Sequence, residues 1–510
     1  MSGHVFVVRG DLRALACDAW LLPTDRSVYV SASWAQGLRG CVPQPPDDWR
    51  DDGCRAFAVP GKPRERPMPW LVNVGRTPGT PVGWYMDGVR QFLRAAGAAA
   101  LARGALYDRA RPLLALPLVG TGEGGAGRVA GEVAATLLDV LWEEAGRLAV
   151  DIALVTGTLP AFAAAQARRR SAGAAAYESL GELGERARQL GAEAGRGQLV
   201  VFLGAGISAA AGVPLWNALL DRLARESGFR DEEREALGRL HALDRARIIE
   251  GRLAAHGQRI DDRVVALMAS DHVSLAHALL ASLPVAEFAT TNYDTLFERA
   301  CADAGRPAAV LPYEPVTGRT RWLLKMHGSI DHPDDIVLTR QDYLRYSERR
   351  AALTGIVQAL LVTRHMLFAG FSLQDEHFHR LVHDVRNAIG AARRQGTPTG
   401  FGTALILRPE PFLRELWATD LEVLALEADD DSPRTGARQL EIVLDQMLLA
   451  ATSGAEHLLD GAFEGVLTPA ERHLRDALGW MKARVPEEAR TGVAWERVAR
   501  FLRELGDTGD

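Results

Sequence analysis

Short runs of apolar residues alternate with longer, partly polar stretches along most of the chain. In residues 1–165 the apolar runs read HVFVVRG, AWLLPT, PWLVNVG, PLLALPLVG and DIALVTG. Each run has the length of a strand, and Ala-rich stretches with helical propensity lie between them. Strands that alternate with helices are typical of an α/β fold with crossover connections. We therefore expect a first α/β domain over residues 1–165.

A second series of apolar runs begins at Leu199, and we expect it to form another α/β domain over residues 196–427. Its predicted strands cover residues 199–203, 285–290, 323–326, 366–371, 404–407 and 421–426. A charged helical insertion is expected between the first two of these strands, at residues 217–283. The Ala- and Arg-rich residues 166–195 have few large apolar side chains, which indicates a connecting helical segment.

The last part of the chain has a helical pattern, and we expect a C-terminal helical region over residues 437–510. The preceding run EADDDSPRTG (427–436) is typical of a loop or linker. Thr468 followed by Pro469 predicts a helix start, with threonine as N-cap and proline in the first helical position. The apolar stripe that contains Leu474, Leu478 and Met481 is expected to pack onto the core rather than to mediate oligomerisation.

Composition and charge fit a globular protein whose main partner is not nucleic acid. The 510 residues exceed one ordinary core, so two or three domains are expected. The net charge of −6 disfavours nucleic-acid binding. No apolar run approaches the roughly 20 residues of a membrane span. The chain enters its first strand at once without the apolar stretch of a signal peptide. We expect a soluble, cytoplasmic protein without a membrane partner.

The cysteines give no indication of a metal site. Cys17, Cys41, Cys54 and Cys301 form no C-x-x-C pair, and a structural zinc usually draws its ligands from such pairs. Four cysteines are also too few for a disulfide scaffold in a chain of 510 residues. We therefore expect neither zinc nor another metal.

A glycine turn directly follows the strand predicted at 199–203. Gly204 and Gly206 begin it, and Ser208 adds a hydroxyl that is able to donate a hydrogen bond to an anion. Such turns direct backbone N–H groups toward phosphates. The next glycine, Gly212, comes six residues after the second instead of three, so a tight structural turn remains the alternative reading.

Polar side chains also follow three other predicted strands of this domain. The carboxyl ends of parallel strands meet in one crevice, which is where open α/β sheets bind their ligands. Capping or turn motifs explain any one of these strand ends, but they explain all of them together poorly. The side chains concerned are Asn292 and Asp294 in TNYD, His327 and Ser329 in KMHGS, and Ser372 and Asp375 after Gly370 in GFSLQD.

In this order, GAGIS, TNYD, KMHGS and GFSLQD resemble the sirtuin superfamily over residues 196–427. The resemblance is closest to the zinc-less, sirtuin-like NAD-consuming domains of bacterial anti-phage systems of the Thoeris type. It implies cleavage of the nicotinamide–ribose bond, with NAD⁺ as a substrate rather than a cofactor. By resemblance, Asn292 and His327 are the catalytic pair and Asp294 lines the nicotinamide pocket. The NAD-holding residues it implies are Gly204, Ala205, Gly206 and Ser208 at the phosphates, and Gly370 and Ser372 on the adenosine side.

The side-chain types suit this chemistry. Loss of nicotinamide leaves an oxocarbenium-like ribose, as in glycoside cleavage. An asparagine amide is able to orient water or the nicotinamide carboxamide, and a histidine is able to take a proton. His327 as a purely structural strand-end residue is the alternative. Other histidines, among them His277 and His377, lack a comparable sequence context.

The chain departs from the protein-deacylating sirtuins at two points. It lacks the two cysteine pairs of their zinc ribbon. Their G-I-P-D-F-R stretch is replaced by Gly212-Val213-Pro214-Leu215-Trp216-Asn217, which removes the acid and the arginine. The departures argue against a protein-substrate channel and favour water as the acceptor.

The segments Val7–Asp25 and Leu113–Gly127 together resemble a macro domain, a family that binds ADP-ribose. The resemblance implies an α/β/α domain in which Asp11 contacts adenine and the glycine-rich loop wraps a diphosphate. Leu22-Pro23-Thr24-Asp25 replaces the family's N-A-A-N, and Glu123 would repel phosphate unless it faced away. An α/β domain with no ligand remains the alternative. The loop residues concerned are Gly120, Thr121, Gly122, Gly124 and Gly125.

Three functions follow from these readings. The first is an NAD⁺ hydrolase that acts as an abortive-infection effector, activated by an ADP-ribose-type nucleotide that the first domain senses. A free hydrolase would be toxic, so a silent state is needed, and assembly into a homo-oligomer is a common way to build such a switch. The second is a sirtuin-type protein ADP-ribosyltransferase, and the third is a nucleotide sensor without enzymatic activity.

Overall fold

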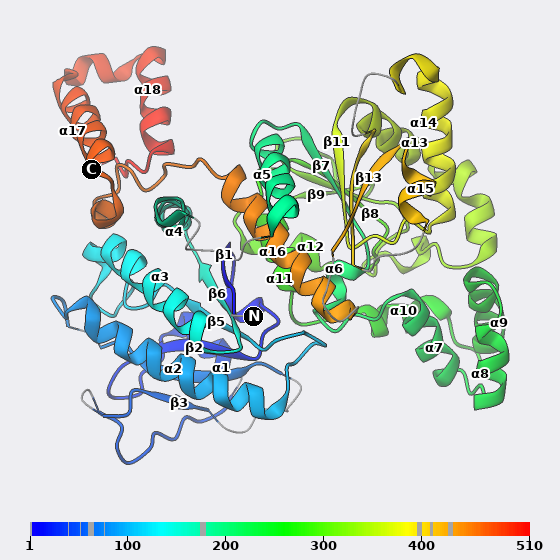
Figure 1. Ribbon diagram of the computed structural model, residues 1–510, viewed down its shortest axis with the longest axis horizontal. Helices are drawn as coiled ribbons and strands as arrows, with labels where there is room; N and C mark the ends of the chain where they lie inside the picture. The colour runs from blue at the N-terminus through cyan, green and yellow to red at the C-terminus, as the bar shows by residue number, and fades with distance from the viewer. Residues whose placement is uncertain are drawn as a thin grey trace. The chain divides into compact units, whose positions relative to one another are not determined.

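The computed structural model describes residues 3–38, 40–50, 53–59, 66–75, 77–173, 180–394, 400–407, 412–426 and 432–509. The chain forms two compact units, shown in Figure 1. Unit 1 comprises Met1–Arg188 together with Asp445–Asp510, and unit 2 comprises Gln189–Leu444. The helices α5 (Gly181–Gly195) and α16 (Pro433–Ala451) each contain residues of both units. Within the described residues, no helix has the length and apolar character that a membrane span needs.

Unit 1 contains a six-stranded sheet in the order β1-β6-β5-β2-β4-β3. Its pairs are parallel except for β3 with β4. Every strand predicted for this part of the chain is present. β3 was not predicted, because its three residues carry no apolar run of strand length. The strands are β1 Val5–Arg9, β2 Ala19–Thr24, β3 Ala56–Ala58, β4 Met68–Asn73, β5 Leu113–Pro117 and β6 Asp151–Thr156.

The helices of unit 1 bury apolar faces. In α3 the buried Val133, Leu137 and Leu141 recur at helical spacing, and this helix contacts β1 and β6. The helices are η1 Leu12–Ala14, α1 Ala32–Leu38, α2 Val82–Arg103, η2 Gly127–Val129, α3 Ala130–Arg147 and α4 Leu159–Ala172.

The C-terminal segment of unit 1 follows α16 and is helical, as the pattern predicts. Its elements are η5 Gly461–Val466, α17 Pro469–Arg484, η6 Glu487–Thr491 and α18 Val493–Glu504. Thr468 caps α17 as expected, since its hydroxyl accepts a hydrogen bond from the Glu471 N–H. The loop prediction for 427–436 is wrong at its end because α16 begins at Pro433, and residues 427–431 lie outside the described part.

The apolar stripe of α17 does not pack onto the core, so this expectation is wrong. Leu474 is 51% exposed, and no residue of α17 is buried. Ion pairs link the helix to the neighbouring segments, at 2.6 Å between Lys482 and Asp507 and at 3.1 Å between Arg475 and Glu464. Its first turn is closed by the capping box of Thr468.

Unit 2 contains a fully parallel seven-stranded sheet in the order β13-β12-β11-β7-β8-β10-β9. All predicted strands are present with shifts of one or two residues, and the three-residue β9 was not predicted. The strands are β7 Leu199–Leu203, β8 Glu287–Thr290, β9 Ala309–Leu311, β10 Trp322–Lys325, β11 His365–Ala369, β12 Gly402–Ile406 and β13 Leu421–Ala425.

The insertion between β7 and β8 is helical, which confirms the prediction for residues 217–283. On one side of the sheet, Phe202, Phe368, Phe371 and Phe378 form an aromatic cluster with ring centroids 4.7–6.1 Å apart. The remaining helices are α6 Gly206–Ala209, α7 Trp216–Glu226, α8 Asp231–Gly238, α9 Ala242–Ala255, α10 Ile260–Met268, α11 Leu275–Ser282, α12 Leu296–Asp303, η4 Pro333–Asp335, α13 Arg340–Thr363, α14 Glu376–Arg394 and α15 Leu413–Trp417.

Candidate functional site

The sheet of unit 2 has a topological switch point at β7. The chain leaves β7 for β8 on one side and later returns to β11 on the other, as the strand order shows (Figure 1). At such a point the connections diverge and leave a crevice at the carboxyl ends of the strands, where α/β sheets bind ligands. The glycine turn, TNYD and GFSLQD all follow strands that border this point.

The glycine turn packs tightly against the end of β11. The Gly204 N–H donates to the Ala369 carbonyl and the Gly206 N–H donates to the Gly370 carbonyl, both at 2.9 Å. A Cβ on Gly204 would lie 2.3 Å from the Gly370 oxygen. Glycine is therefore required here for close backbone approach. The N–H groups expected to face a phosphate are used within the fold, and the phosphate role of this turn stays a prediction.

Asn292 holds its side-chain amide in a defined orientation beside this turn. Its Nδ2 donates to the Gly204 carbonyl at 3.1 Å and lies 3.3 Å from the Ser208 hydroxyl. The side chain is 8% exposed. With the amide nitrogen bound to the turn, Oδ1 is the atom of this side chain that is able to accept a hydrogen bond. The assignment of nitrogen and oxygen follows from these partners.

Ser208 links Asn292 to Asp294 and to a buried histidine. Its hydroxyl donates to Asp294 Oδ2 at 2.8 Å, and His277 Nε2 lies 3.4 Å from the Ser208 hydroxyl oxygen. His277 Nδ1 accepts the Ser274 N–H at 3.2 Å, so the neutral ring carries its proton on Nε2. Burial lowers the pKa of His277 to about 4. The serine hydroxyl thus supports the TNYD loop, and His277 has a context that the sequence did not reveal.

Lys325 is a further residue of the site that sequence reasoning missed. Its side chain is fully buried, and Nζ donates to the backbone carbonyl oxygens of Tyr293 at 3.2 Å and Asp294 at 2.5 Å. It also forms an ion pair of 2.8 Å with Glu298. The ammonium group therefore fixes the backbone that carries Asn292 and Asp294. Its place at the end of β10, two residues before His327, was the available signal.

His327 is 3% exposed and lies against a second histidine. The distance from His327 Nε2 to His377 Nδ1 is 3.3 Å, and Asp375 Oδ2 is 3.9 Å from the same Nε2. His377 Nε2 lies 3.2 Å from the Tyr343 carbonyl, so it carries the proton and Nδ1 is the acceptor. Burial lowers the pKa of His327 to about 4, which leaves the imidazole neutral at pH 7.

Aromatic side chains of α13 surround this pair of histidines. The Tyr343 ring stacks on His377 with centroids 4.0 Å apart, and Tyr346 lies at the same distance. The Tyr343 hydroxyl donates to Asp375 Oδ2 at 2.9 Å. The sequence separated His327 from His377 and provided no reason to join them, because α13 and β11 intervene in the chain.

The predicted residues thus fall into two groups and one outlier. Asn292, Asp294 and Ser208 share one hydrogen-bonded network next to the glycine turn, and Gly370 packs against that turn with φ of +65°. His327 belongs to the network of α13 and α14. Ser372 lies exposed beyond the end of β11.

The sequence of the same region matches a known family model. Residues 286–424 match the family model of the SIR2-like domain. Part of unit 2 is therefore similar to the SIR2-like domain. The sirtuin resemblance inferred from TNYD, KMHGS and GFSLQD is confirmed, while the glycine turn lies before the matched residues.

Relatives of the SIR2-like domain carry names that describe NAD⁺ hydrolysis and defence. The NAD(+) hydrolase ThsA of Bacillus cereus (strain MSX-D12) is 28% identical over 207 residues, which is 38% of this chain and 41% of that protein. The NAD(+) hydrolase ThsA of Enterococcus faecium is 30% identical over 197 residues, 38% of this chain and 40% of that protein. The defense-associated sirtuin 2 of Bacillus subtilis is 26% identical over 198 residues, which is 37% of this chain and 19% of that protein. The chain thus spans about two fifths of the ThsA relatives it matches.

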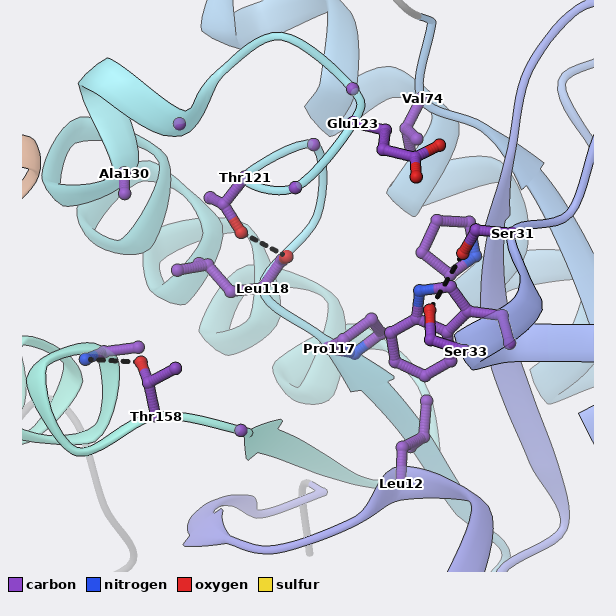
Figure 2. Close-up of a pocket in the computed structure, with 18 of the residues that line it drawn as sticks. Leu12, Ser31, Ser33, Val74, Pro117, Leu118, Thr121, Glu123, Ala130 and Thr158 are labelled. Atoms are coloured by element: carbon purple, nitrogen blue, oxygen red, sulfur yellow. Dashed lines mark hydrogen bonds between the residues drawn. The ribbon is translucent and has the colours of Figure 1, made fainter.

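Unit 1 has its own pocket at the carboxyl ends of its strands. The pocket has a volume of about 730 Å³, within the usual range for small-molecule sites. Figure 2 shows Leu12, Pro117, Thr121 and Thr158 around it. Asp11, Gly120, Thr121, Gly122 and Gly124 line it, as expected of a ligand-binding loop.

Two of the predicted ligand residues of unit 1 are engaged within the protein. Gly125 turns against the backbone of Thr77, where a Cβ would lie 2.8 Å from the Thr77 carbonyl carbon. Asp11 caps η1 and forms an ion pair of 2.6 Å with Arg13. Ala462 and Phe463 of η5 also line the pocket, a contribution from the C-terminal segment that the sequence did not indicate.

The charged residues among the pocket's lining are mostly acidic. Among the described residues that line it, these are Asp11, Asp25 and Glu123, with Arg13 as the cation. In Figure 2 the Glu123 side chain extends beside Val74, away from Thr158. Carboxylates of this kind are able to accept hydrogen bonds from the hydroxyl and amino groups of a ligand.

Proposed function

We propose that the SIR2-like domain hydrolyses NAD⁺ to nicotinamide and ADP-ribose. The observation that carries the proposal is the placement of Asn292, Asp294 and their supporting network at the switch point of the sheet. The names of the ThsA relatives indicate the same reaction. NAD⁺ is the substrate in this scheme.

The reaction needs a water, an oriented nicotinamide and a proton acceptor. The electron pair of the N-glycosidic bond moves to the pyridinium nitrogen as nicotinamide leaves. The water oxygen forms the new bond to the ribose carbon. In the proposal Asn292 Oδ1 orients the water, Asp294 lines the nicotinamide pocket, and the neutral His327 takes the water proton.

The NAD-binding part of the proposal rests on the strand ends beside the switch point. Gly204, Ala205 and Gly206 would approach the phosphates by backbone contact, and Gly370 and Ser372 would border the adenosine. Ser208 would contribute through Asp294 and Asn292, because its hydroxyl already donates to the Asp294 carboxylate.

We infer further that unit 1 senses an ADP-ribose-type activator. The glycine-rich loop offers backbone N–H groups to a diphosphate, and the acidic lining suits the hydroxyl and amino groups of such a nucleotide. The macro-like reading of unit 1 belongs to this proposal. We further propose that the protein is an anti-phage, abortive-infection effector in the cytoplasm. In this proposal it is a homo-oligomer that stays silent until the activator binds.

Transfer of ADP-ribose to a protein is the second candidate. The exchange of an acid and an arginine for Leu215 and Asn217 disfavours a protein channel, but the cleavage step would be identical.

One experiment tests these proposals. The purified full-length protein is incubated with NAD⁺, with and without ADP-ribose-type nucleotides, and the products are separated by chromatography. Nicotinamide with free ADP-ribose supports hydrolysis, and labelled protein supports transfer. His327→Ala is expected to lower nicotinamide release at least about 100-fold. Near-wild-type release in that variant contradicts the role of His327, and no turnover beyond that of Asn292→Ala under any condition contradicts both activities.

A further inference from the structure

The cluster around His327 has the composition of a transition-metal site. His327, Asp375 and His377 each offer one ligand atom, and the three atoms lie within 4.8 Å of one another. Two imidazoles and one carboxylate are the ligand set that zinc uses where a fourth position stays open. The imidazole ligands select zinc and related ions over Mg²⁺ and Ca²⁺, which prefer oxygen.

The distance between the two histidine nitrogens matches that in a tetrahedral metal site. In a tetrahedral site with bonds of about 2.0–2.1 Å, the ligand atoms lie about 3.3 Å apart. His327 Nε2 and His377 Nδ1 are 3.3 Å apart. Asp375 Oδ2 is 3.9 Å from His327 Nε2, and all three ligand atoms lie within 4.8 Å of one another, so the Asp375 carboxylate has to move closer to complete a tetrahedral site.

The surrounding residues already hold the ligands as outer-shell partners of a metal would. Metal-binding histidines usually donate their other ring N–H to a carbonyl or carboxylate. His377 Nε2 lies 3.2 Å from the Tyr343 carbonyl, which leaves Nδ1 for the ion. Asp375 accepts the Tyr343 hydroxyl at 2.9 Å and the Phe378 N–H at 3.0 Å. Tyr343 therefore supports two of the three ligands.

We propose that His327, Asp375 and His377 bind a divalent transition-metal ion such as Zn²⁺, and that the bound ion blocks the active site. Binding moves the His327 proton from Nε2 to Nδ1, because Nε2 must present its lone pair to the metal. In the metal-free protein Nε2 carries the proton and Nδ1 is the basic nitrogen, so once the proton has moved to Nδ1 neither ring nitrogen is able to accept a substrate proton. The binding stands on the geometry alone, whereas the inhibition rests on the proposed function.

The test titrates the full-length protein with Zn²⁺ by calorimetry, and with Co²⁺ by its visible absorption. One ion per chain is expected, with no comparable binding of Mg²⁺. Replacing a ligand, in His377→Asn or in Asp375→Asn, is expected to weaken binding at least about 10-fold. His379→Asn is the matched control, because His379 lies on the same helix, is exposed and packs on Trp417.

Each outcome decides one part of the proposal. Equal Zn²⁺ affinity in wild type, His377→Asn and Asp375→Asn overturns the site, as does equal weakening in the His379 control. Circular dichroism identifies a variant that fails to fold, and the other ligand variant then carries the comparison. If Zn²⁺ binds as expected while NAD⁺ turnover is unaffected, the blocking role is wrong. If no turnover exists even with EDTA and the ADP-ribose-type nucleotides, the proposed function fails while the binding result stands.

Discussion

At the scale of single residues, the site depends on side chains that are fixed before any substrate arrives. Asn292 is held by Gly204 and Ser208, and Lys325 holds the backbone of the same loop at 2.5–3.2 Å. A buried ammonium group of this kind is stable only with its partners in place. Preorganised amides and dipoles are effective in catalysis because they need no rearrangement during the reaction.

His277 makes the stability of unit 2 depend on pH. Its pKa lies at about 4 in the folded protein because of burial, against 6.5 for the ordinary imidazole. The unfolded chain therefore binds more protons between these values, and the free energy of unfolding falls as the pH drops from 6.5 toward 4. One pKa unit corresponds to about 1.4 kcal/mol, so the contribution is about 3 kcal/mol.

Hydrogen exchange of the β7 and β8 amides at several pH values between 7.5 and 4.5 measures this loss. In His277→Gln the side chain no longer titrates, and we expect the loss of stability to be smaller by up to about 3 kcal/mol. An identical pH dependence in wild type and variant would show that His277 does not carry the effect.

At the scale of elements, the sequence predicted the strands well and their contacts poorly. Apolar runs of four or more residues marked their strands, whereas β3 and β9, with three residues each, carried no such signal. The polar strand ends around β7 followed from the parallel order alone. His377 was not predictable as a neighbour of His327, because tertiary packing of α14 joins residues that no local pattern connects.

The sequence also did not predict that η5 packs against α3. This contact leads to a prediction about the stability of unit 1. A Cβ on Gly131 of α3 would lie 2.8 Å from the Phe463 carbonyl, so Gly131→Ala forces η5 away. Overpacking of this kind costs about 1–3 kcal/mol. Gly146 lies on the same helix with open space around its Cβ position, and Gly146→Ala is expected to stabilise by about 0.5–1 kcal/mol.

Urea unfolding of both variants, followed through a probe in unit 1, compares the two glycines directly. Opposite signs are expected, since both substitutions raise helix propensity and only Gly131 meets a neighbouring backbone. If Gly131→Ala stabilised unit 1 as much as Gly146→Ala, the close contact between α3 and η5 would be excluded.

At the scale of the whole molecule, the proposal assigns sensing to unit 1 and catalysis to unit 2. Such an arrangement requires a ligand with different affinities for the silent and active states. The pocket of unit 1 is lined by residues of its sheet and of η5. A bound ligand would therefore contact both the N-terminal and the C-terminal part of this unit. The sequence indicated the glycine loop but not the wall that η5 provides.

Gly122→Val separates sensing from catalysis. Gly122 lines the pocket, and a Cβ there meets open space, so the larger side chain fills the ligand's volume without straining the loop. We expect ADP-ribose affinity to fall at least about 10-fold, which corresponds to about 1.4 kcal/mol. Activated NAD⁺ hydrolysis should be lost with it, while the free energy of unfolding stays within about 0.5 kcal/mol of wild type.

Calorimetry measures the ADP-ribose affinity, and nicotinamide release measures the activation. Gly83→Val, outside the pocket, is the control. Unchanged ADP-ribose affinity in Gly122→Val would contradict the pocket assignment, whereas lost affinity with intact activation would place the sensor elsewhere in the chain.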